Sequence, residues 1–336
     1  MTLTVLGTSA GEAAAARPPA VEVSGLVKTF DEVEAVRGID LSVPGGELFG
    51  FLGPNGAGKS TTIKILCTLL RPTAGTARVA GFDVVRDRTE VRRHIGLVFQ
   101  ETTLDAYLTA EQNLRFHAEI YGMPKADVGP RIDVVLEMVG LTDRRRSPVR
   151  TFSGGMKRRL EIARGLLHSP RVLFLDEPTI GLDPESRAGL WDYVDRLRAE
   201  EDITVFLTTH YMDEAERCDR IAIVDAGRIG ALDTPSALKA SVGHDRVRVQ
   251  TTDDDAAEAL VRDRLGMETE REGGALVVLT PDGERFVPQL FELGLTVRSV
   301  SVSRPTLDDV FLAYTGARMS ERQAVAGGRG PRGGRR

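Results

Sequence analysis

The sequence predicts a mixed α/β protein with three parts: a core of alternating strands and helices, a helical segment inserted into it, and a small α+β domain after it. Three observations predict this. A glycine-rich turn at residues 53–60 stands between a short apolar run and a helical segment. Apolar, β-branched runs recur up to residue 224, as in buried parallel strands. After residue 243, alternating strands and amphipathic helices follow.

The glycine-rich turn is the most informative segment. Residues 53–60 are Gly-Pro-Asn-Gly-Ala-Gly-Lys-Ser, which fits the phosphate-binding pattern G-x-x-x-x-G-K-[ST]. Glycines let the backbone curl so that successive N–H groups point at an anion. Lys59 can place a positive charge at the outer phosphates, and the Ser60 hydroxyl can hold Mg²⁺. A chance match is disfavoured, because a strand is expected at 48–52 and a helix, with its positive dipole end, at 61–70.

The core is expected to extend over residues 21–243. Its helical insert spans about residues 101–165, where the pattern contains no strand-like run. The expected edge strands are 21–24 and 39–43, the buried strands 172–175, 204–209 and 221–224, and the insert helices 110–122 and 131–139.

Residues 244–316 are expected to form a separate α+β domain, whose size is within the usual range. Thr306 is expected to cap its last helix. Disorder is expected for the Ala/Gly/Pro-rich residues 1–20 and for the Gly/Arg-rich residues 317–336. The expected strands are 247–251, 275–280 and 296–302, and the expected helices 254–265, 284–293 and 306–314.

Composition excludes several classes of protein. The net charge of −5 gives no sign of a general affinity for nucleic acids. Cys67 and Cys218 lie far apart in helical segments, so neither a disulfide framework nor a metal site is expected, and a reducing compartment fits. No apolar run is long enough to span a membrane, and the start lacks the basic region of a secretory signal.

Two carboxylates follow the expected strand at 172–175. Asp176 at the end of a strand near a phosphate loop can hold Mg²⁺ through water. Glu177 points elsewhere and can orient a water for in-line attack on the γ-phosphorus. Acidic pairs are common in turns, and the apolar strand before this pair favours the functional interpretation.

A second anion site is expected at Ser153, Gly154 and Gly155. They precede a helical segment at 157–167, so hydroxyl, backbone N–H groups and helix dipole would act together. Both sites either touch one nucleotide, or each serves a nucleotide shared with a second copy of the chain.

In this order, the motifs resemble those of the ATP-binding subunits of ABC transporters, over about residues 21–235. The resemblance implies an ABC ATPase fold and pairs residues 53–61 with the Walker A loop, Ser153–Gly155 with the signature motif, and residues 181–183 with the D-loop. It implies catalytic roles for Glu177, His210 and Gln100, and Mg²⁺ binding by Ser60, Gln100 and Asp176. The nucleotide-binding residues that it implies are Phe30, which would stack on adenine, and Gly53, Pro54, Asn55, Gly56, Ala57, Gly58, Lys59, Ser60, Thr61, Ser153, Gly154 and Gly155.

Phe30, Gln100 and His210 would each be unremarkable alone, as a core, strand-end or capping residue. Departures from the family pattern are Phe152 for the usual leucine, Met156 for the usual glutamine, and Phe30 for the more frequent tyrosine. None removes the Ser-Gly-Gly turn or the stacking face. Residues 154–163 and 305–316 are similar to the daunorubicin-resistance branch of drug exporters, whose added C-terminal domain would account for 244–316.

The resemblance implies that two copies face head to tail and sandwich ATP and Mg²⁺, and that hydrolysis releases them. The expected function is to power the efflux of a drug or antibiotic-like compound through a separate membrane permease, from the cytoplasmic face of the membrane, with the helical insert as the docking surface. Alternatives are another cargo (a lipid, polysaccharide or ion) and a regulatory ABC ATPase without a transport role. A soluble ABC ATPase of ribosomes or DNA is disfavoured, because those have tandem cassettes or a long coiled-coil insert. No nucleic-acid partner is expected.

Overall fold

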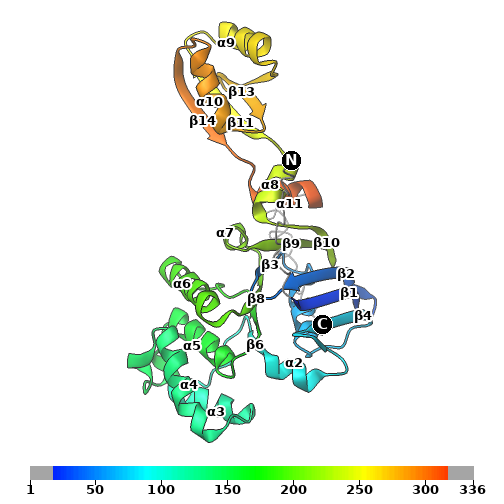
Figure 1. The fold of residues 1–336 in the computed structure, drawn as a ribbon, viewed down its shortest axis with the longest axis vertical. Coiled ribbons are helices and arrows are strands. Elements are labelled where there is room, and N and C mark those ends of the chain that lie inside the picture. Colours follow the sequence, from blue (N-terminus) through cyan, green and yellow to red (C-terminus); the bar gives the residue numbers. More distant parts are fainter. Residues whose placement is uncertain (1–17, 317–336) are drawn as a thin grey trace, which may run out of the picture.

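The computed structural model describes residues 18–316, and most of the disorder expected for 1–20 and 317–336 lies outside these residues. The expectation was wrong at Pro19 and Ala20, which pair as the start of a strand. Figure 1 shows a large core and a small C-terminal unit joined to it by a narrow neck. In the core, one sheet of six strands has the order β10-β9-β3-β8-β7-β6, and its pairs are parallel except for β9 with β10. Its strands are β3 (Leu48–Leu52), β6 (Ile95–Val98), β7 (Val172–Asp176), β8 (Thr204–Thr209), β9 (Arg220–Asp225) and β10 (Arg228–Asp233).

The central strands are buried on both faces. Every residue of β3, β7 and β8 is buried, which explains why they appear in the sequence as continuous apolar runs. On one face the rings of Phe49 and Phe174 lie 5.3 and 5.4 Å from that of Phe206. The leucines on the other face pack against the helices. This double burial fixes the relative positions of the strand ends that carry the site.

A second, antiparallel sheet covers the phenylalanine face, with the order β2-β1-β4-β5. The sequence predicted parts of β1 and β2 but neither β4 nor β5. The strands are β1 (Pro19–Phe30), β2 (Val33–Pro44), β4 (Ala74–Val79) and β5 (Phe82–Asp83).

The first core helix is shorter than expected. α1 (Lys59–Leu66) ends before residue 70, because Thr68 has the left-handed φ of +63°. Arg92 holds this bend through a 2.8 Å bond to the Thr68 hydroxyl. The other core helices are α2 (Arg88–His94), α6 (Pro184–Glu201), α7 (Met212–Ala215) and α8 (Pro235–Val242).

Residues 101–165 contain helices and no strand, which is the pattern behind the prediction of a helical insert. Its helices are α3 (Ala110–Ile120), α4 (Lys125–Met138) and α5 (Gly154–Leu166), and they lie beside α6 at one side of the core in Figure 1. Thr109 caps α3 through a capping box with Gln112.

The C-terminal unit is a four-stranded antiparallel sheet with the order β12-β13-β11-β14. Val247 and Val249 of the sheet pack with Phe286 and Leu290 in a core of its own. The expected helix 254–265 ends as an α-helix at Leu260 and continues as a π-helical turn. The elements are β11 (Asp245–Thr251), β12 (Thr269–Glu272), β13 (Ala275–Thr280), β14 (Val297–Ser303), α9 (Asp254–Leu260) and α10 (Gly283–Glu292).

The last helix, α11 (Leu307–Thr315), returns to the core instead of packing in the C-terminal unit. Thr306 caps it through a capping box with Asp309, as the sequence predicts. Its Val310 and Phe311 are buried in the same cluster as Leu238 of α8. The chain therefore crosses the neck twice, as Figure 1 shows.

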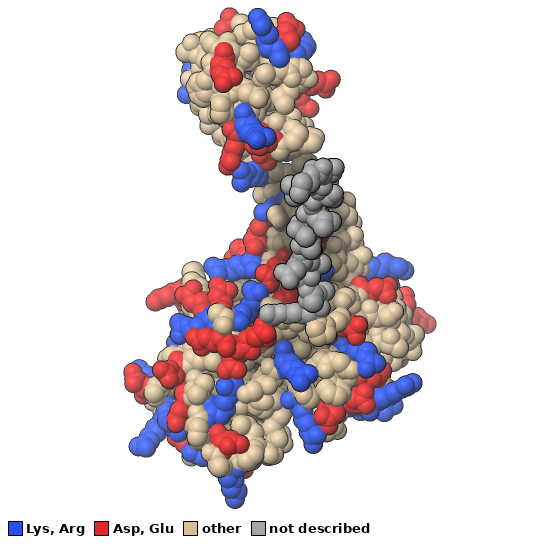
Figure 2. Space-filling view, viewed as in Figure 1, with Lys and Arg blue, Asp and Glu red and all other residues tan. Residues whose placement is uncertain are grey.

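Between residues 18 and 316, the structure holds no helix with both the length and the apolar character that crossing a membrane requires. On the face shown in Figure 2, acidic and basic side chains are interspersed over the core and the C-terminal unit.

Candidate functional site

The phosphate loop, residues 53–60, connects β3 to α1 and needs its glycines. A Cβ on Gly53 would lie 2.3 Å from the carbonyl oxygen of Val224. Gly58 has a φ of +100°, and a Cβ there would lie 2.4 Å from the carbonyl oxygen of Ala35. Both neighbours are backbone atoms, so a side chain at either position would displace the loop.

Lys59 lies under this loop with only 4% of its surface exposed. Its Nζ donates to the carbonyl oxygens of Gly53 (2.8 Å) and Pro54 (3.1 Å). It also lies 3.1 Å from Glu177 Oε1. Burial lowers the pKa of Lys59, and the carboxylate of Glu177 opposes this shift. The ammonium group is thus held between the loop and the predicted catalytic carboxylate.

Asp176 ends β7 beside the start of α1. Its Oδ1 accepts from the hydroxyls of Ser60 (3.2 Å) and Thr208 (2.6 Å). A hydroxyl and a carboxylate side by side form a hard oxygen donor set, which suits Mg²⁺. The set is small, and Mg²⁺ usually takes its remaining ligands from substrate phosphates and water. The residues present therefore fit the predicted metal.

Glu177 has an unusual backbone. Its φ is +48°, in the left-handed region, and its N–H donates to the carbonyl and hydroxyl oxygens of Thr208 at 3.2 and 3.1 Å. The Nδ1 of His210 lies 3.4 Å from Glu177 Oε1. Burial alone would raise the pKa of Glu177, but His210 and Lys59 together lower it. Glu177 is thus held as a carboxylate facing the phosphate loop.

Within the described part of the chain, three predicted residues make no direct polar contact with the phosphate-loop lysine or the strand-end aspartate. Among residues 18–316, no hydrogen bond or ion pair joins Phe30, Gln100 or Ser153 to Lys59 or Asp176. Phe30 is 42% exposed at the β1 end, with the Lys28 ammonium 4.8 Å from its ring centre, so it is not a core residue. Gln100 is exposed just after β6.

The Ser-Gly-Gly segment lies at the N-terminus of α5, as the sequence predicts, but the helix begins at Gly154 and not at the expected residue 157. The Ser153 hydroxyl caps the helix by accepting from the Met156 N–H at 3.2 Å. Ser153 and Gly154 are exposed, whereas Gly155 is buried against Ser186 of α6. An exposed helix N-terminus with a small side chain leaves space for an anion supplied from outside this chain.

Comparisons with known proteins agree with this geometry. A family model described as ABC transporter matches residues 36–180, and one described as the ATP-binding protein DrrA1-3-like C-terminal domain matches residues 234–315. The chain is 44% identical to the daunorubicin/doxorubicin resistance ATP-binding protein DrrA of Streptomyces peucetius, over 88% of this chain and 92% of that one. The chain belongs to the ABC transporter family. It is one of the ATP-binding subunits that hydrolyse ATP, in the DrrA-like branch.

Other members of the family are similar over 64% to 88% of the chain. Identity to the linearmycin resistance ATP-binding protein LnrL of Bacillus subtilis (strain 168) is 36%, over 88% of this chain and 98% of the relative. The structure of cbiO1 from Clostridium perfringens, part of the complex cbiONQ, matches with a TM-score of 0.63 and 26% identity, over 74% and 97% of the two chains. The dimeric structure of the ATP-binding cassette MJ0796 bound to ADP and Pi matches with a TM-score of 0.58 and 27% identity. The match covers 64% of this chain and 98% of that one. The predicted ABC ATPase fold is confirmed.

Two side chains of the site escaped the sequence prediction. Thr208 bridges Asp176 and the Glu177 backbone, and only its place in the strand before His210 pointed to it. Arg158 lies beside the same strand end; it belongs to the segment 154–163 that resembles the drug-exporter branch, but the sequence gives it no role in the site. Both act through hydrogen bonds between distant segments, which spacing in the sequence does not encode.

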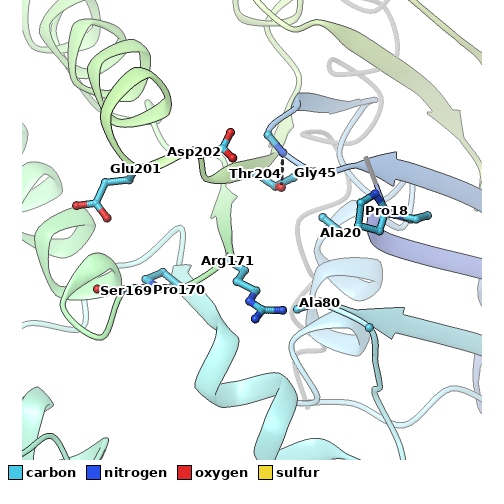
Figure 3. A pocket seen from close by; sticks show the side chains of 13 residues that line it. Pro18, Ala20, Gly45, Ala80, Ser169, Pro170, Arg171, Glu201, Asp202 and Thr204 are labelled. Carbon is cyan, nitrogen blue, oxygen red and sulfur yellow. Dashed lines mark hydrogen bonds between the residues drawn. The ribbon is translucent and has the colours of Figure 1, made fainter. Parts of the chain in front are cut away.

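A cavity of about 700 Å³ lies at the amino ends of the central strands, opposite to the ends that carry the phosphate loop and Asp176 (Figure 3). Arg171 precedes β7 there, and Thr204, the first residue of β8, accepts from the Gly46 N–H at 2.9 Å. Ligands of open α/β sheets bind at the carboxyl ends of the strands. This cavity lies at the amino ends and is separate from the phosphate loop.

Gly155→Ala is expected to destabilise the fold by about 1–3 kcal/mol, because it overpacks the α5–α6 contact. The new Cβ would lie 2.4 Å from Ser186 Oγ and 2.8 Å from Ser186 Cβ, so rotating the hydroxyl does not relieve the clash. Gly154→Ala is the matched control, since its nearest neighbour is Leu182 Cδ2 at 3.8 Å. Equal midpoints of urea unfolding for the two variants would refute this packing argument.

His117 is expected to make the fold sensitive to acid. Burial, reinforced by Arg164 and His168, lowers the pKa of His117 to about 3, from an ordinary 6.5. Between these values the unfolded chain binds a proton that the native state does not, so stability falls as pH falls. We expect His117→Phe to lose less stability than wild type in urea unfolding between about pH 7.5 and about pH 5. Replacement of the exposed His244 is the control, and an unchanged pH slope in His117→Phe would contradict the expectation.

Proposed function

We propose that this chain powers the efflux of a drug or antibiotic-like compound through a separate membrane permease, acting at the cytoplasmic face of the membrane. The observation that carries the proposal is the 44% identity, over 88% of the chain, to a protein whose name states daunorubicin and doxorubicin resistance. The match to the DrrA1-3-like C-terminal domain supports the same branch. A permease is required because transport needs a path across the membrane.

The site residues would share the work as follows. Backbone N–H groups of the phosphate loop and Lys59 bind the phosphates of ATP, and Phe30 stacks on the adenine. Ser60 and Asp176 would hold Mg²⁺ with Gln100, and the metal would neutralise phosphate charge. Glu177 accepts a proton from the attacking water, and His210 orients the terminal phosphate.

ATP would act between two copies of the chain. Ser153, Gly154 and Gly155 of one copy supply a helix N-terminus to the nucleotide held by the phosphate loop of the other. This arrangement accounts for the exposure of Ser153 at the start of α5. Because ATP would bind only the joined state tightly, its hydrolysis would release the copies and move the permease. The helical insert would dock on the permease.

The test is co-expression with the candidate permease in a drug-sensitive host. We expect export of daunorubicin and ATP hydrolysis that rises with the drug, both lost with Glu177→Gln. A permease that exports linearmycin but not daunorubicin would favour the alternative cargo, which the 36% identity to LnrL supports. ATP hydrolysis with no permease dependence would contradict the proposal.

A further inference from the structure

A buried arginine of α5, Arg158, connects two segments that carry predicted site residues. It is 6% exposed. Its Nε donates to the carbonyl oxygen of Pro178 at 2.7 Å, and one terminal nitrogen donates to that of Asp176 at 3.2 Å. The other terminal nitrogen donates to the carbonyl oxygen of Phe99. One guanidinium therefore holds the backbone on both sides of Glu177 and the residue just before Gln100.

Glu161, one turn along α5, holds the far side of the Gln100 segment. It is fully buried and lies 3.2 Å from the guanidinium of Arg158. Its Oε1 accepts from the N–H of Thr103 at 2.6 Å and from the Thr103 hydroxyl at 3.2 Å. Side chains of α5 thus form hydrogen bonds to the chain on both sides of Gln100, at Phe99 and at Thr103.

The chemistry of the Arg158–Glu161 pair suits a role in holding backbone groups in place. Burial lowers the pKa of Arg158, and Glu161 opposes the shift, so the pair stays buried only because its bonds are satisfied. A guanidinium is a rigid, planar fork with five donors, and it can hold three carbonyl groups in fixed directions. An ammonium group of the same charge is a point donor on a flexible stem and cannot reproduce this geometry.

We infer that Arg158, supported by Glu161, is a positioning residue for ATP hydrolysis: it fixes the segment of Gln100 against the backbone of Asp176 and Glu177. The same helix begins at Ser153, so a nucleotide that contacts Ser153 also engages the helix that sets the position of Gln100. The inference rests on the proposed roles of Gln100 and Glu177.

The test is a double-mutant cycle between Arg158→Lys and Gln100→Ala, with ATPase rates measured against ATP and against Mg²⁺. We expect Arg158→Lys to lower kcat about tenfold or more with little change in the KM for ATP, because misplacement of a catalytic group acts on the reaction step. It should raise the Mg²⁺ requirement, and we expect Gln100→Ala to do the same. In the Gln100→Ala background, its effect on the Mg²⁺ requirement should nearly vanish.

Arg131→Lys is the matched control. Arg131 also donates from α4 to backbone carbonyls, those of Leu166 (2.8 Å) and Leu167 (3.3 Å), and pairs with Glu201, away from the phosphate loop. It should leave kcat and the Mg²⁺ requirement unchanged. If Arg158→Lys folds poorly, Glu161→Gln, which keeps the size of its side chain, takes its place. We expect it to lower kcat and raise the Mg²⁺ requirement by smaller factors.

The outcomes separate the inference from the proposed function. A Gln100→Ala variant with an unchanged Mg²⁺ requirement would refute the role of Gln100, and with it the basis of the inference. If Gln100→Ala raises the Mg²⁺ requirement but Arg158→Lys leaves it unchanged, the inference is overturned and the proposed function is not. The inference also fails if the two substitutions change the Mg²⁺ requirement independently, so that their factors multiply in the double variant. It fails as well if Arg131→Lys lowers kcat as much as Arg158→Lys does, because Arg158 would then have only a structural role.

Discussion

Glu177→Gln is expected to abolish ATP turnover while the protein retains its nucleotide. The amide has nearly the size of the carboxylate but cannot accept a proton from water, so the rate should fall by about 100-fold or more. The ion pair with Lys59 is lost as well. Lys59 still donates to the carbonyl groups of Gly53 and Pro54, so the loop should keep its shape and bind ATP.

Steady-state hydrolysis together with the ATP retained after gel filtration measures both halves of this expectation. Glu292→Gln, an exposed position on α10, controls for loss of charge and should behave as wild type. Hydrolysis at the wild-type rate in Glu177→Gln would end the assignment of Glu177 as the base.

Lys59→Ala is expected to weaken ATP binding itself, and not only the rate. A charge-assisted bond to phosphate contributes about 1.5–3 kcal/mol, so the Kd should rise by about tenfold or more. The variant also leaves Glu177, which is 7% exposed, without its ammonium partner. Repulsion between this carboxylate and the phosphates would then add to the loss.

Titration with a fluorescent ATP analogue measures the affinity, and thermal unfolding without nucleotide checks the fold. Lys64→Ala, an exposed lysine one turn along the same helix, is the matched control. Unchanged affinity in a folded Lys59→Ala protein would argue against the proposed phosphate contact.

The sequence predicted the buried strands well for a physical reason. Residues of β7 and β8 are covered on both faces, so burial leaves a continuous apolar run. β4 and β12 escaped prediction because β4 contains small and polar residues and β12 is the exposed run Thr-Glu-Arg-Glu. The predicted end of α1 was wrong because Thr68 has a left-handed backbone conformation that stops the helix. Arg92 of α2 stabilises it through a hydrogen bond to the Thr68 hydroxyl.

The candidate site was predictable only in part. Lys59, Asp176 and His210 belong to local motifs, and the parallel order β9-β3-β8-β7 brings the ends of their strands to one edge of the sheet. The contacts of Arg158 and Thr208 depend on which distant backbone groups lie opposite them. That information comes from the register between strands and the placement of α5.

The composite nucleotide site is the central claim, and the mass of the Glu177→Gln protein in solution tests it most directly. With Mg²⁺ and ATP, light scattering should give twice the 36.5 kDa of one chain, with one nucleotide retained per chain. Adding Ser153→Arg, which places a bulky side chain at the exposed start of α5, should return the protein to the single-chain mass while each chain still binds ATP. A protein that stays at the mass of one chain with ATP bound, or a dimer indifferent to Ser153→Arg, would contradict the claim.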